Sequence, residues 1–263
     1  MSELMHACSV LQKTDVKEMR YFFSPEGKLA IARLMQHRAL LAFDFDGTLA
    51  PIVANPEDAR VPLPVAKCLA ILSARHPIAI ITGRKLSDVK SRLGFEPTYA
   101  VGNHGAEGLD WELKGTALQV LRDRLNLQAS SLREAGIRVE DKGLSFALHF
   151  RTAKNREEAR RALNNLTADL PSGLSAFDGK CVLNIVLSTA PDKGQAALEL
   201  LKISGCESLL FVGDDANDEA VFRCAKADWL TVRIGQSKDV SCAMFFLNSH
   251  SEMVEFLTCI QRA

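Results

Sequence analysis

Short apolar runs alternate with helix-forming segments along most of this 263-residue chain. The apolar runs lie at residues 40–45, 77–81, 99–101, 209–212 and 229–234, and the helical patterns lie at residues 65–75, 86–93, 193–203, 217–225 and 251–260. Because the runs are apolar on both faces, they fit a parallel sheet that is covered by helices. The alternation therefore predicts an α/β fold with a doubly wound parallel sheet as its core.

The middle of the chain follows a different pattern. Long amphipathic helical patterns lie at residues 116–135 and 154–170, and period-two alternation of apolar and polar residues lies at residues 137–142, 144–151 and 180–187. Period two indicates an antiparallel sheet with one apolar face on the helices and one more polar face left open. We therefore expect an α+β cap domain at residues 108–187, inserted into a core formed by residues 1–107 and 188–263. Residues 1–38 are a polar, weakly helical extension of that core.

Composition argues against several classes of protein. Lys and Arg together number 32, as do Asp and Glu, so the formal net charge is zero and no basic surface for nucleic acid or an anionic membrane is expected. No apolar run approaches the roughly 20 residues of a membrane-spanning helix, and no secretory signal is recognisable. Seven scattered cysteines without a C-x-x-C pair indicate reduced thiols. We expect a cytoplasmic protein, monomeric or weakly homo-oligomeric, without nucleic-acid or membrane partners.

Two carboxylates end the first apolar run. Asp44 and Asp46 lie two residues apart, directly before Gly47. Residues i and i+2 of an extended strand share a face, so both carboxylates can point at one reaction centre. Such a pair can supply a metal ligand, a nucleophile and a general acid. A structural strand-to-turn corner, where Asp and Gly are common, is the alternative interpretation.

Two further segments lie where open parallel sheets place their ligands, at strand ends and helix starts. Thr82, Gly83 and Arg84 follow an apolar run, and a hydroxyl beside a glycine backbone can hold a phosphate oxygen. Lys193 opens a helical pattern, where its ammonium group can neutralise a phosphate. Taken alone, Thr-Gly is usually only a helix entry, and a lysine at a helix start is more often solvated.

Acidic residues crowd the end of the apolar run at residues 209–212. Asp214, Asp215 and Asp218 follow this run within six residues. Carboxylates suit Mg²⁺, which takes hard oxygen ligands and keeps several waters. Helix N-capping is the alternative role for acidic residues at such a corner. Two adjacent aspartates directly after a buried strand favour the metal, because without a cation they would repel each other.

Together the segments read D-x-D-G-T, T-G-R, K and G-D-D-x-x-D, and this ordered set resembles the phosphotransferases of the haloacid dehalogenase (HAD) superfamily. The resemblance implies that Asp44 is a nucleophile that becomes an aspartyl-phosphate. It implies that Asp46 protonates the leaving alcohol and then activates water. Thr82 and Lys193 would hold the phosphoryl oxygens. The acid at Asp46 favours a phosphatase or mutase, since dehalogenases lack it.

The same resemblance implies Mg²⁺ as the cofactor. Asp44, the main-chain carbonyl of Asp46 and Asp214 would bind the metal. Asp215 and Asp218 would orient metal-bound waters and Lys193. The resemblance also implies that the insert closes over a small soluble substrate as a HAD-type cap.

Other segments are similar to those of trehalose-6-phosphate phosphatases. They read D-F-D-G-T-L-A-P-I at residues 44–52, N-H-G-A-E at residues 103–107, E-D-K-G at residues 140–143, A-L-H-F-R at residues 147–151 and G-D-D-A-N-D-E at residues 213–219. The similarity implies that Glu140 and Lys142 reach the glucose unit remote from the phosphate. His104 and Glu107 would contact substrate where core and cap meet, and a structural hinge contact is the alternative for His104.

The polar cap face offers Arg151 and Asn184 as further substrate ligands. Charged and amide groups with fixed hydrogen-bond directions suit a polyhydroxylated ligand, and a solvated sheet face is the alternative. Asn184 stands where the family typically has Glu, and Asn217 stands where it usually has Thr. Asn184 can still hydrogen-bond a sugar hydroxyl but brings no negative charge.

We therefore expect a Mg²⁺-dependent phosphatase of a small sugar phosphate, with trehalose 6-phosphate as the leading substrate. Sucrose 6-phosphate and mannosyl-3-phosphoglycerate are the alternative substrates. A non-catalytic sugar-phosphate sensor is the alternative from another class. Its signature would be a lost nucleophile, acid, lysine or metal aspartate, and all of these residues are present.

Overall fold

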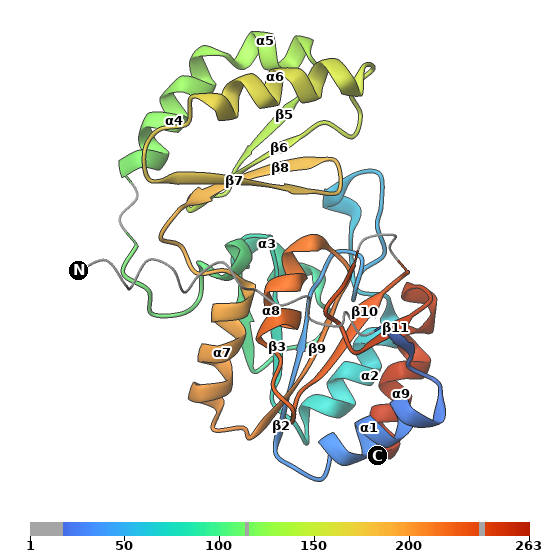
Figure 1. Ribbon diagram of the computed structural model, residues 1–263. Helices are drawn as coiled ribbons and strands as arrows, with labels where there is room; N and C mark the ends of the chain where they lie inside the picture. The colour runs from blue at the N-terminus through green and yellow to red at the C-terminus, as the bar shows by residue number, and fades with distance from the viewer. Residues whose placement is uncertain (1–17, 114–115, 237–239) are drawn as a thin grey trace, which may run out of the picture.

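A computed structural model describes residues 18–113, 116–236 and 240–263 of the chain, and two sheets organise it (Figure 1). The larger sheet contains, in spatial order, β1 (Arg20–Tyr21), β11 (Phe245–Leu247), β10 (Leu230–Ile234), β9 (Ser208–Gly213), β2 (Ala39–Phe43), β3 (Ile78–Ile81) and β4 (Tyr99–Val101). All neighbouring strands in it are parallel. This sheet is the core that the alternation of apolar runs and helices predicts.

Helices cover both faces of the parallel sheet. One face carries α1 (Pro25–Leu34), α2 (Leu63–Ser73) and α9 (Met253–Arg262), and the other carries α7 (Lys193–Ser204) and α8 (Glu219–Cys224). A short α3 (Leu86–Val89) follows β3, and 3₁₀ turns lie at η1 (Pro56–Asp58), η2 (Lys90–Arg92), η3 (Asn103–Gly105), η4 (Ala216–Asp218) and η5 (His250–Glu252). The doubly wound α/β prediction is confirmed.

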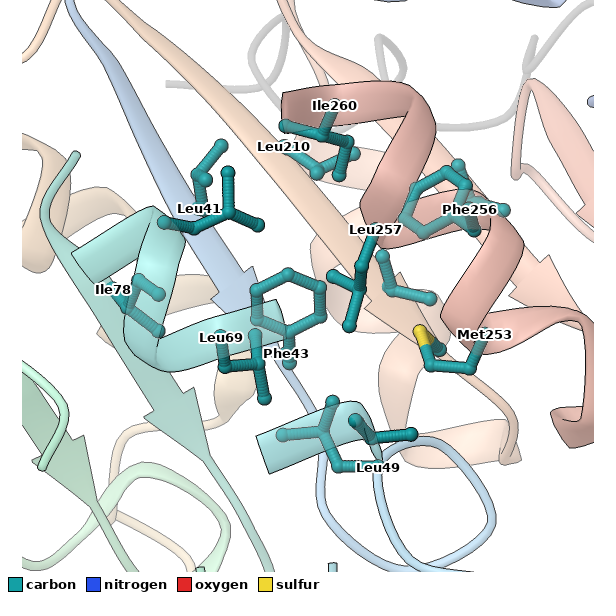
Figure 2. Packing of buried hydrophobic residues seen from close by; sticks show 14 of the residues in the cluster. Leu41, Phe43, Leu49, Leu69, Ile78, Leu210, Met253, Phe256, Leu257 and Ile260 are labelled. Carbon is teal, nitrogen blue, oxygen red and sulfur yellow. The ribbon is translucent and has the colours of Figure 1, made fainter. Parts of the chain in front are cut away.

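The interior strand β2 shows how the residues produce these layers. All five of its residues are buried. Leu41 and Phe43 pack into the cluster that includes Leu69 of α2 and Leu257 of α9, and Figure 2 shows these side chains converging. Leu40, on the opposite face, packs into the cluster formed with α7 and α8. Because successive side chains alternate across a strand, a run that is apolar throughout must be covered on both sides.

The second sheet is antiparallel and lies above the parallel one in Figure 1. Its strands, in spatial order, are β5 (Arg138–Asp141), β6 (Ser145–His149), β8 (Val182–Leu187) and β7 (Leu174–Gly179). Three helices, α4 (Thr116–Leu127), α5 (Ala129–Glu134) and α6 (Arg156–Ala168), cover the side that faces away from the parallel sheet. The predicted insert is thus a helix-covered antiparallel sheet, and its boundaries at residues 108 and 187 remain a prediction.

The polar face of this sheet differs from the expectation of an open face. Ser145 and Asn184 lie on it and are 1% and 3% exposed. Ser145 donates a hydrogen bond to Asn103 Oδ1 of η3 (2.6 Å), so this face is turned toward the parallel sheet. The face is polar because it lines the space between the two sheets, where polar side chains find partners on the core.

Several elements differ from the sequence expectation. The helix expected at residues 116–135 is two helices that break at Gln128. The strands β7 and β11 were not expected, because each is weakly patterned and is held by pairing with a stronger neighbour. The described part of the N-terminal extension adds β1 and α1 to the core, where Phe22 is fully buried and packs edge-on against Phe256 (ring centroids 4.6 Å apart). Within the described ranges, no helix has both the length and the apolar character to cross a membrane.

Candidate active site

The candidate residues gather at the carboxyl ends of three neighbouring strands. Asp44 follows β2, Asp214 follows β9, and Thr82 follows β3. These strands lie side by side in the order β9-β2-β3, so their carboxyl ends open at the same edge of the sheet. Asp44 N continues the ladder by donating to Val212 O (2.9 Å), which fixes the direction in which the strand delivers its aspartate.

Lys193 bridges two of the carboxylates. Its Nζ lies 2.9 Å from Asp44 Oδ1 and 2.8 Å from Asp218 Oδ1, and its side chain is 1% exposed. A capping box formed by Asp192 and Gln195 sets the start of α7 and therefore the place of this lysine. Burial alone would lower the pKa of Lys193, but Asp218 and Asp44 raise it, so the group is a permanent cation.

Asp218 organises the loop that carries Asp214 and Asp215. It is completely buried, and its Oδ2 accepts hydrogen bonds from Asp214 N (2.8 Å) and Asp215 N (2.9 Å). A side chain at Gly213 would place its Cβ 2.4 Å from the Asp218 carboxylate, so this close approach requires glycine. Asp215 is half-buried and caps η4 by accepting a hydrogen bond from Ala216 N (2.8 Å). In the same turn, Asn217 Oδ1 is buried and has no hydrogen-bond partner within the described residues.

Three carboxylates form a cluster that fits a divalent cation. Asp44, Asp214 and Asp218 each offer an oxygen, and these oxygens lie within 4.8 Å of one another. Burial raises the pKa of Asp44 well above its ordinary value despite the charge of Lys193, and Asp218 and Asp214 raise it further. Burial likewise raises the pKa of Asp214 to about 6. Asp214 Oδ1 is buried and has no hydrogen-bond partner among the described residues. The three carboxylates still exceed the charge of the two lysines that contact them, Lys193 and Lys180, and an unpartnered oxygen among the carboxylates suits a metal ion.

The cap contributes a second lysine to this cluster. Lys180 lies in the turn between β7 and β8, and its Nζ donates to Asp214 Oδ2 and to Asp214 O (3.2 Å). The sequence pattern places Lys180 on the polar cap face but does not identify it as a site residue. The contact depends on how the β7–β8 turn docks on the core, which no local pattern encodes.

Thr82, Gly83 and His104 form a compact wall at the end of β3. Thr82 is 1% exposed, and its Oγ1 accepts a hydrogen bond from Arg84 N (3.2 Å). A Cβ at Gly83 would lie 2.3 Å from His104 Cε1, so the glycine allows the imidazole to lie against the backbone. His104 has a φ of 61°, and its ring lies edge-on to Phe177 with centroids 5.1 Å apart.

His104 is a neutral imidazole in this wall. It is 8% exposed, and neither ring nitrogen has a hydrogen-bond partner in the described part of the chain. Burial, followed by the charges of Lys142 and Lys193, lowers the pKa of His104 well below its ordinary value. A buried imidazole with free nitrogens is prepared to exchange hydrogen bonds with a polar ligand.

Cap and core are joined by a buried hydrogen-bond network. Lys142 Nζ donates to Gly83 O (2.8 Å), and Asn103 Nδ2 donates to Lys142 O (3.4 Å). Glu107 Oε2 accepts from Asn103 Nδ2 (2.7 Å) and from Leu86 N (3.1 Å). Burial lowers the pKa of Lys142. Glu107 thus stabilises the core segment that contacts the cap, and Lys142 connects the cap to the core.

Other predicted cap residues lie along the same face. Glu140 Oε2 and His149 Nε2 are 2.8 Å apart. Burial alone would raise the pKa of Glu140, but the hydrogen bond to His149 and the charge of Lys142 lower it to about 2. Arg151 Nη1 donates to Val53 O of the core (3.3 Å). Asn184, described above, is buried on the central strand β8.

Asp46 and Arg84 form a separate pair at the edge of the cluster. Arg84 Nε lies 2.7 Å from Asp46 Oδ2, and Arg84 Nη2 lies 2.7 Å from Asp46 Oδ1. The Asp46 side chain is 40% exposed, whereas that of Arg84 is 10% exposed. The arginine is therefore the fixed member of the pair, and the aspartate is the member that solvent or a ligand can reach.

Comparisons with known proteins agree with this geometry. A sequence model of the family described as trehalose-phosphatase matches residues 42–251. A protein of Mycobacterium tuberculosis (strain ATCC 25618 / H37Rv) named trehalose-phosphate phosphatase is 29% identical over 247 residues, which cover 87% of this chain and 63% of the relative. One of the same name from Mycobacterium avium (strain 104) is 30% identical over 233 residues, covering 81% and 60%. The chain therefore spans less than two thirds of the length of these relatives.

Solved structures show the same fold. The C-terminal domain of the C. albicans trehalose-6-phosphate phosphatase has a TM-score of 0.78 at 19% identity, covering 92% of this chain and 98% of that one. The Aspergillus fumigatus trehalose-6-phosphate phosphatase has a TM-score of 0.59 at 23% identity, covering 94% and 100%. At these identities the likeness concerns the fold: a parallel core with a smaller second sheet.

Proposed function

Because this chain belongs to the trehalose-phosphatase family, we propose that it is a phosphatase that hydrolyses trehalose 6-phosphate to trehalose and phosphate. The observation that carries the proposal is the buried bridge from Lys193 to Asp44 and Asp218, with Asp214 in the same cluster. A carboxylate can attack a phosphate dianion only where fixed cations cancel the repulsion. The bridge supplies such a cation at the expected nucleophile.

The proposed reaction gives different roles to two aspartates. Asp44 forms a bond from a carboxylate oxygen to phosphorus while the bond from phosphorus to the sugar oxygen breaks, which leaves an aspartyl-phosphate. Asp46 gives its proton to the departing sugar oxygen. It then takes a proton from the water that attacks phosphorus, and this step releases phosphate and restores Asp44.

The remaining core residues hold charge in place. Lys193 and the Thr82 hydroxyl, with the Gly83 backbone beside it, orient the phosphoryl oxygens, and Asp218 fixes the lysine. Asp44, Asp214 and the main-chain carbonyl of Asp46 would hold Mg²⁺, with Asp215 and Asp218 orienting its waters. When bound, Mg²⁺ supplies positive charge to the phosphoryl group. The buried cluster and the unpartnered Asp214 oxygen support this assignment.

The cap, which we assign to residues 108–187 with the core at residues 1–107 and 188–263, would read the sugar. Glu140 and Lys142 are proposed to contact the glucose unit remote from the phosphate, and His104 lies where cap and core meet. Arg151 and Asn184 complete the polar face. The support is that the four cap residues lie on the face of the cap that is turned to the core, where a polyhydroxylated ligand would find fixed donors and acceptors. Free cysteines among the described residues fit a reducing, cytoplasmic setting.

Phosphate release from a panel of sugar phosphates, with and without Mg²⁺, tests the proposal. Trehalose 6-phosphate, sucrose 6-phosphate and mannosyl-3-phosphoglycerate form the panel, and Asp44→Asn is the matched control that keeps the shape of the nucleophile. We expect Mg²⁺-dependent turnover that prefers trehalose 6-phosphate and disappears in Asp44→Asn. Preference for another sugar phosphate of the panel would be consistent with the mechanism and would point to Asn184 of the cap as the cause of the changed substrate preference. No turnover of any member would favour a sugar-phosphate sensor.

A further inference from the structure

The Arg84 guanidinium holds the Asp46 carboxylate in a bidentate ion pair. Arg84 Nε and Nη2 donate to the two different oxygens of Asp46, each at 2.7 Å. Two parallel hydrogen bonds between a planar guanidinium and a carboxylate fix the orientation of the carboxylate as well as its distance. A half-exposed aspartate would otherwise be free to change rotamer.

The arginine itself is anchored on three further sides. Nη1 donates to Asp88 Oδ2 (2.7 Å), Nη2 also donates to Pro56 O (2.7 Å), and the guanidinium lies over the Phe45 ring, 5.1 Å from its centroid. Asp88 is held in turn by Arg92. Four hydrogen bonds therefore occupy a group with five N–H donors.

These hydrogen bonds limit the capacity of Arg84 to bind a phosphate group. The sequence motif makes Arg84 a candidate phosphate ligand, which requires a free guanidinium edge. In the structure the edge formed by Nε and Nη2 binds Asp46, while Nη1 binds Asp88 and Nη2 also binds Pro56 O. Its firmest contact is with the residue that the proposed mechanism uses as acid and base.

We propose that Arg84 is a positioning residue that holds Asp46 in place for proton transfer to the leaving sugar oxygen. The inference rests on the proposed function. To carry a proton, Asp46 must withdraw one oxygen from the guanidinium. When Asp46 Oδ1 leaves Nη2, Nη2 retains its hydrogen bond to Pro56 O, so the arginine stays in place. The Asp46 carboxylate then rotates about the hydrogen bond that its Oδ2 accepts from Nε. Oδ1, turned away from the guanidinium, takes up a proton from solvent and passes it to the sugar oxygen as the bond from that oxygen to phosphorus breaks. The unprotonated Oδ1 then takes a proton from the water that attacks the aspartyl-phosphate.

The leaving group provides the test. A sugar alcohol needs a proton as it departs, whereas the nitrophenolate of 4-nitrophenyl phosphate is a good leaving group without one. General acid catalysis contributes typically 10²–10⁴-fold. We therefore expect Arg84→Met to lower kcat for trehalose 6-phosphate by about 10²-fold while lowering kcat for 4-nitrophenyl phosphate by less than about tenfold. KM for trehalose 6-phosphate should stay within about threefold, since no phosphate contact is lost.

Two further variants separate positioning from structural support. Arg92→Met is the matched control, because Arg92 also binds Asp88 but makes no contact with Asp46, so both substrates should lose activity in equal proportion. Asp46→Asn should reproduce the selective loss, and adding Arg84→Met to it should cost little more, because both changes remove the same proton transfer. Arg84→Lys keeps the charge without the bidentate geometry and serves if Arg84→Met does not fold.

If Arg84→Met lowers kcat for the two substrates by the same factor, the inference is overturned. The same result in Arg84→Lys overturns it if the Arg84→Met variant does not fold. A raised KM for trehalose 6-phosphate with unchanged kcat would also overturn it, since that result marks a phosphate ligand. A wild-type protein that releases phosphate from neither substrate would refute the proposed function instead. The two failures are therefore distinguishable in one set of assays.

Discussion

Replacing Asp218 by Asn removes one charge from the most buried part of the site and almost no volume. In the wild-type protein, Asp218 Oδ1 accepts from Lys193 Nζ (2.8 Å), and Oδ2 accepts from Asp214 N and Asp215 N. The amide oxygen of Asn can retain the two main-chain hydrogen bonds. Its amide nitrogen must then face the Lys193 ammonium, because both groups are donors. The substitution therefore isolates the ion pair.

The structure sets the size of the effect. Removing one partner of a buried ion pair typically costs about 3–5 kcal/mol because the other charge remains buried. Lys193 retains Asp44 at 2.9 Å, so the lower end of the range, about 3 kcal/mol, is expected. For a chain of this size, each kcal/mol shifts the melting temperature by roughly 2–4 °C. Asp218→Asn should therefore melt about 6–12 °C below the wild-type protein.

Thermal unfolding followed by circular dichroism in metal-free buffer measures this shift. Asp215→Asn is the matched control, since Asp215 is the neighbouring acid but is half-buried and only caps η4. Loss of such a cap costs about 1 kcal/mol or less here, because Asn is itself a good capping residue. A melting temperature of Asp218→Asn within about 2 °C of the wild-type value, or equal shifts in the two variants, would refute the electrostatic reasoning.

Three other expectations follow from single contacts. Glu140→Ala should lower kcat/KM for trehalose 6-phosphate at least about tenfold more than for 4-nitrophenyl phosphate, because only the sugar substrate would reach Glu140. Equal losses on the two substrates would contradict a role of the cap in sugar recognition. The pKa of Glu140 is lowered from 4.5 to about 2, mainly through His149 against the effect of burial, so its contribution to stability is complete above pH 4.5 and is lost as pH falls toward 2. Melting temperatures of wild type and Glu140→Gln should therefore converge as pH falls from 4.5 toward 2; a gap that does not narrow would show that the pair is not the cause. Gly47 has a φ of +82°, and a Cβ there would lie 2.1 Å from Asp214 Oδ2. Gly47→Ala should therefore lower the free energy of unfolding by about 1–3 kcal/mol and weaken Mg²⁺ binding measured by calorimetric titration. Unchanged Mg²⁺ affinity would argue against Asp214 as a ligand.

Local patterns predicted the architecture well because they act within a few residues. The run Leu40 to Phe43 is apolar on both faces, and the structure buries it between two helical layers. The period-two segments are strands β5, β6 and β8. The patterns failed where pairing partners, not the segment itself, stabilise the element. β11 has three residues and is held by β10, and β1, in the extension that was expected to be polar and weakly helical, is held by β11.

Some residues of the candidate site could likewise be placed from local patterns, and others could not. The positions of Asp44, Thr82 and Asp214 at the carboxyl ends of strands could be predicted from local sequence, because strand ends are marked by the change from apolar to polar residues. Parallel strands open at one edge, so their meeting followed from topology. Lys193 could be placed because it begins a helix, and a helix start is also a local signal.

The partners of each side chain depend on how distant segments dock in three dimensions. Arg84 pairs with Asp46 from 38 residues away, and Lys180 reaches Asp214 across the space between the two sheets from 34 residues away. His104 is neutral because Gly83 lets its ring lie against the backbone and the cap covers it. A hydrogen bond requires atoms to be placed within a few tenths of an ångström. Such placement comes from the docking of whole elements, whereas the sequence pattern states only which face of an element each residue occupies.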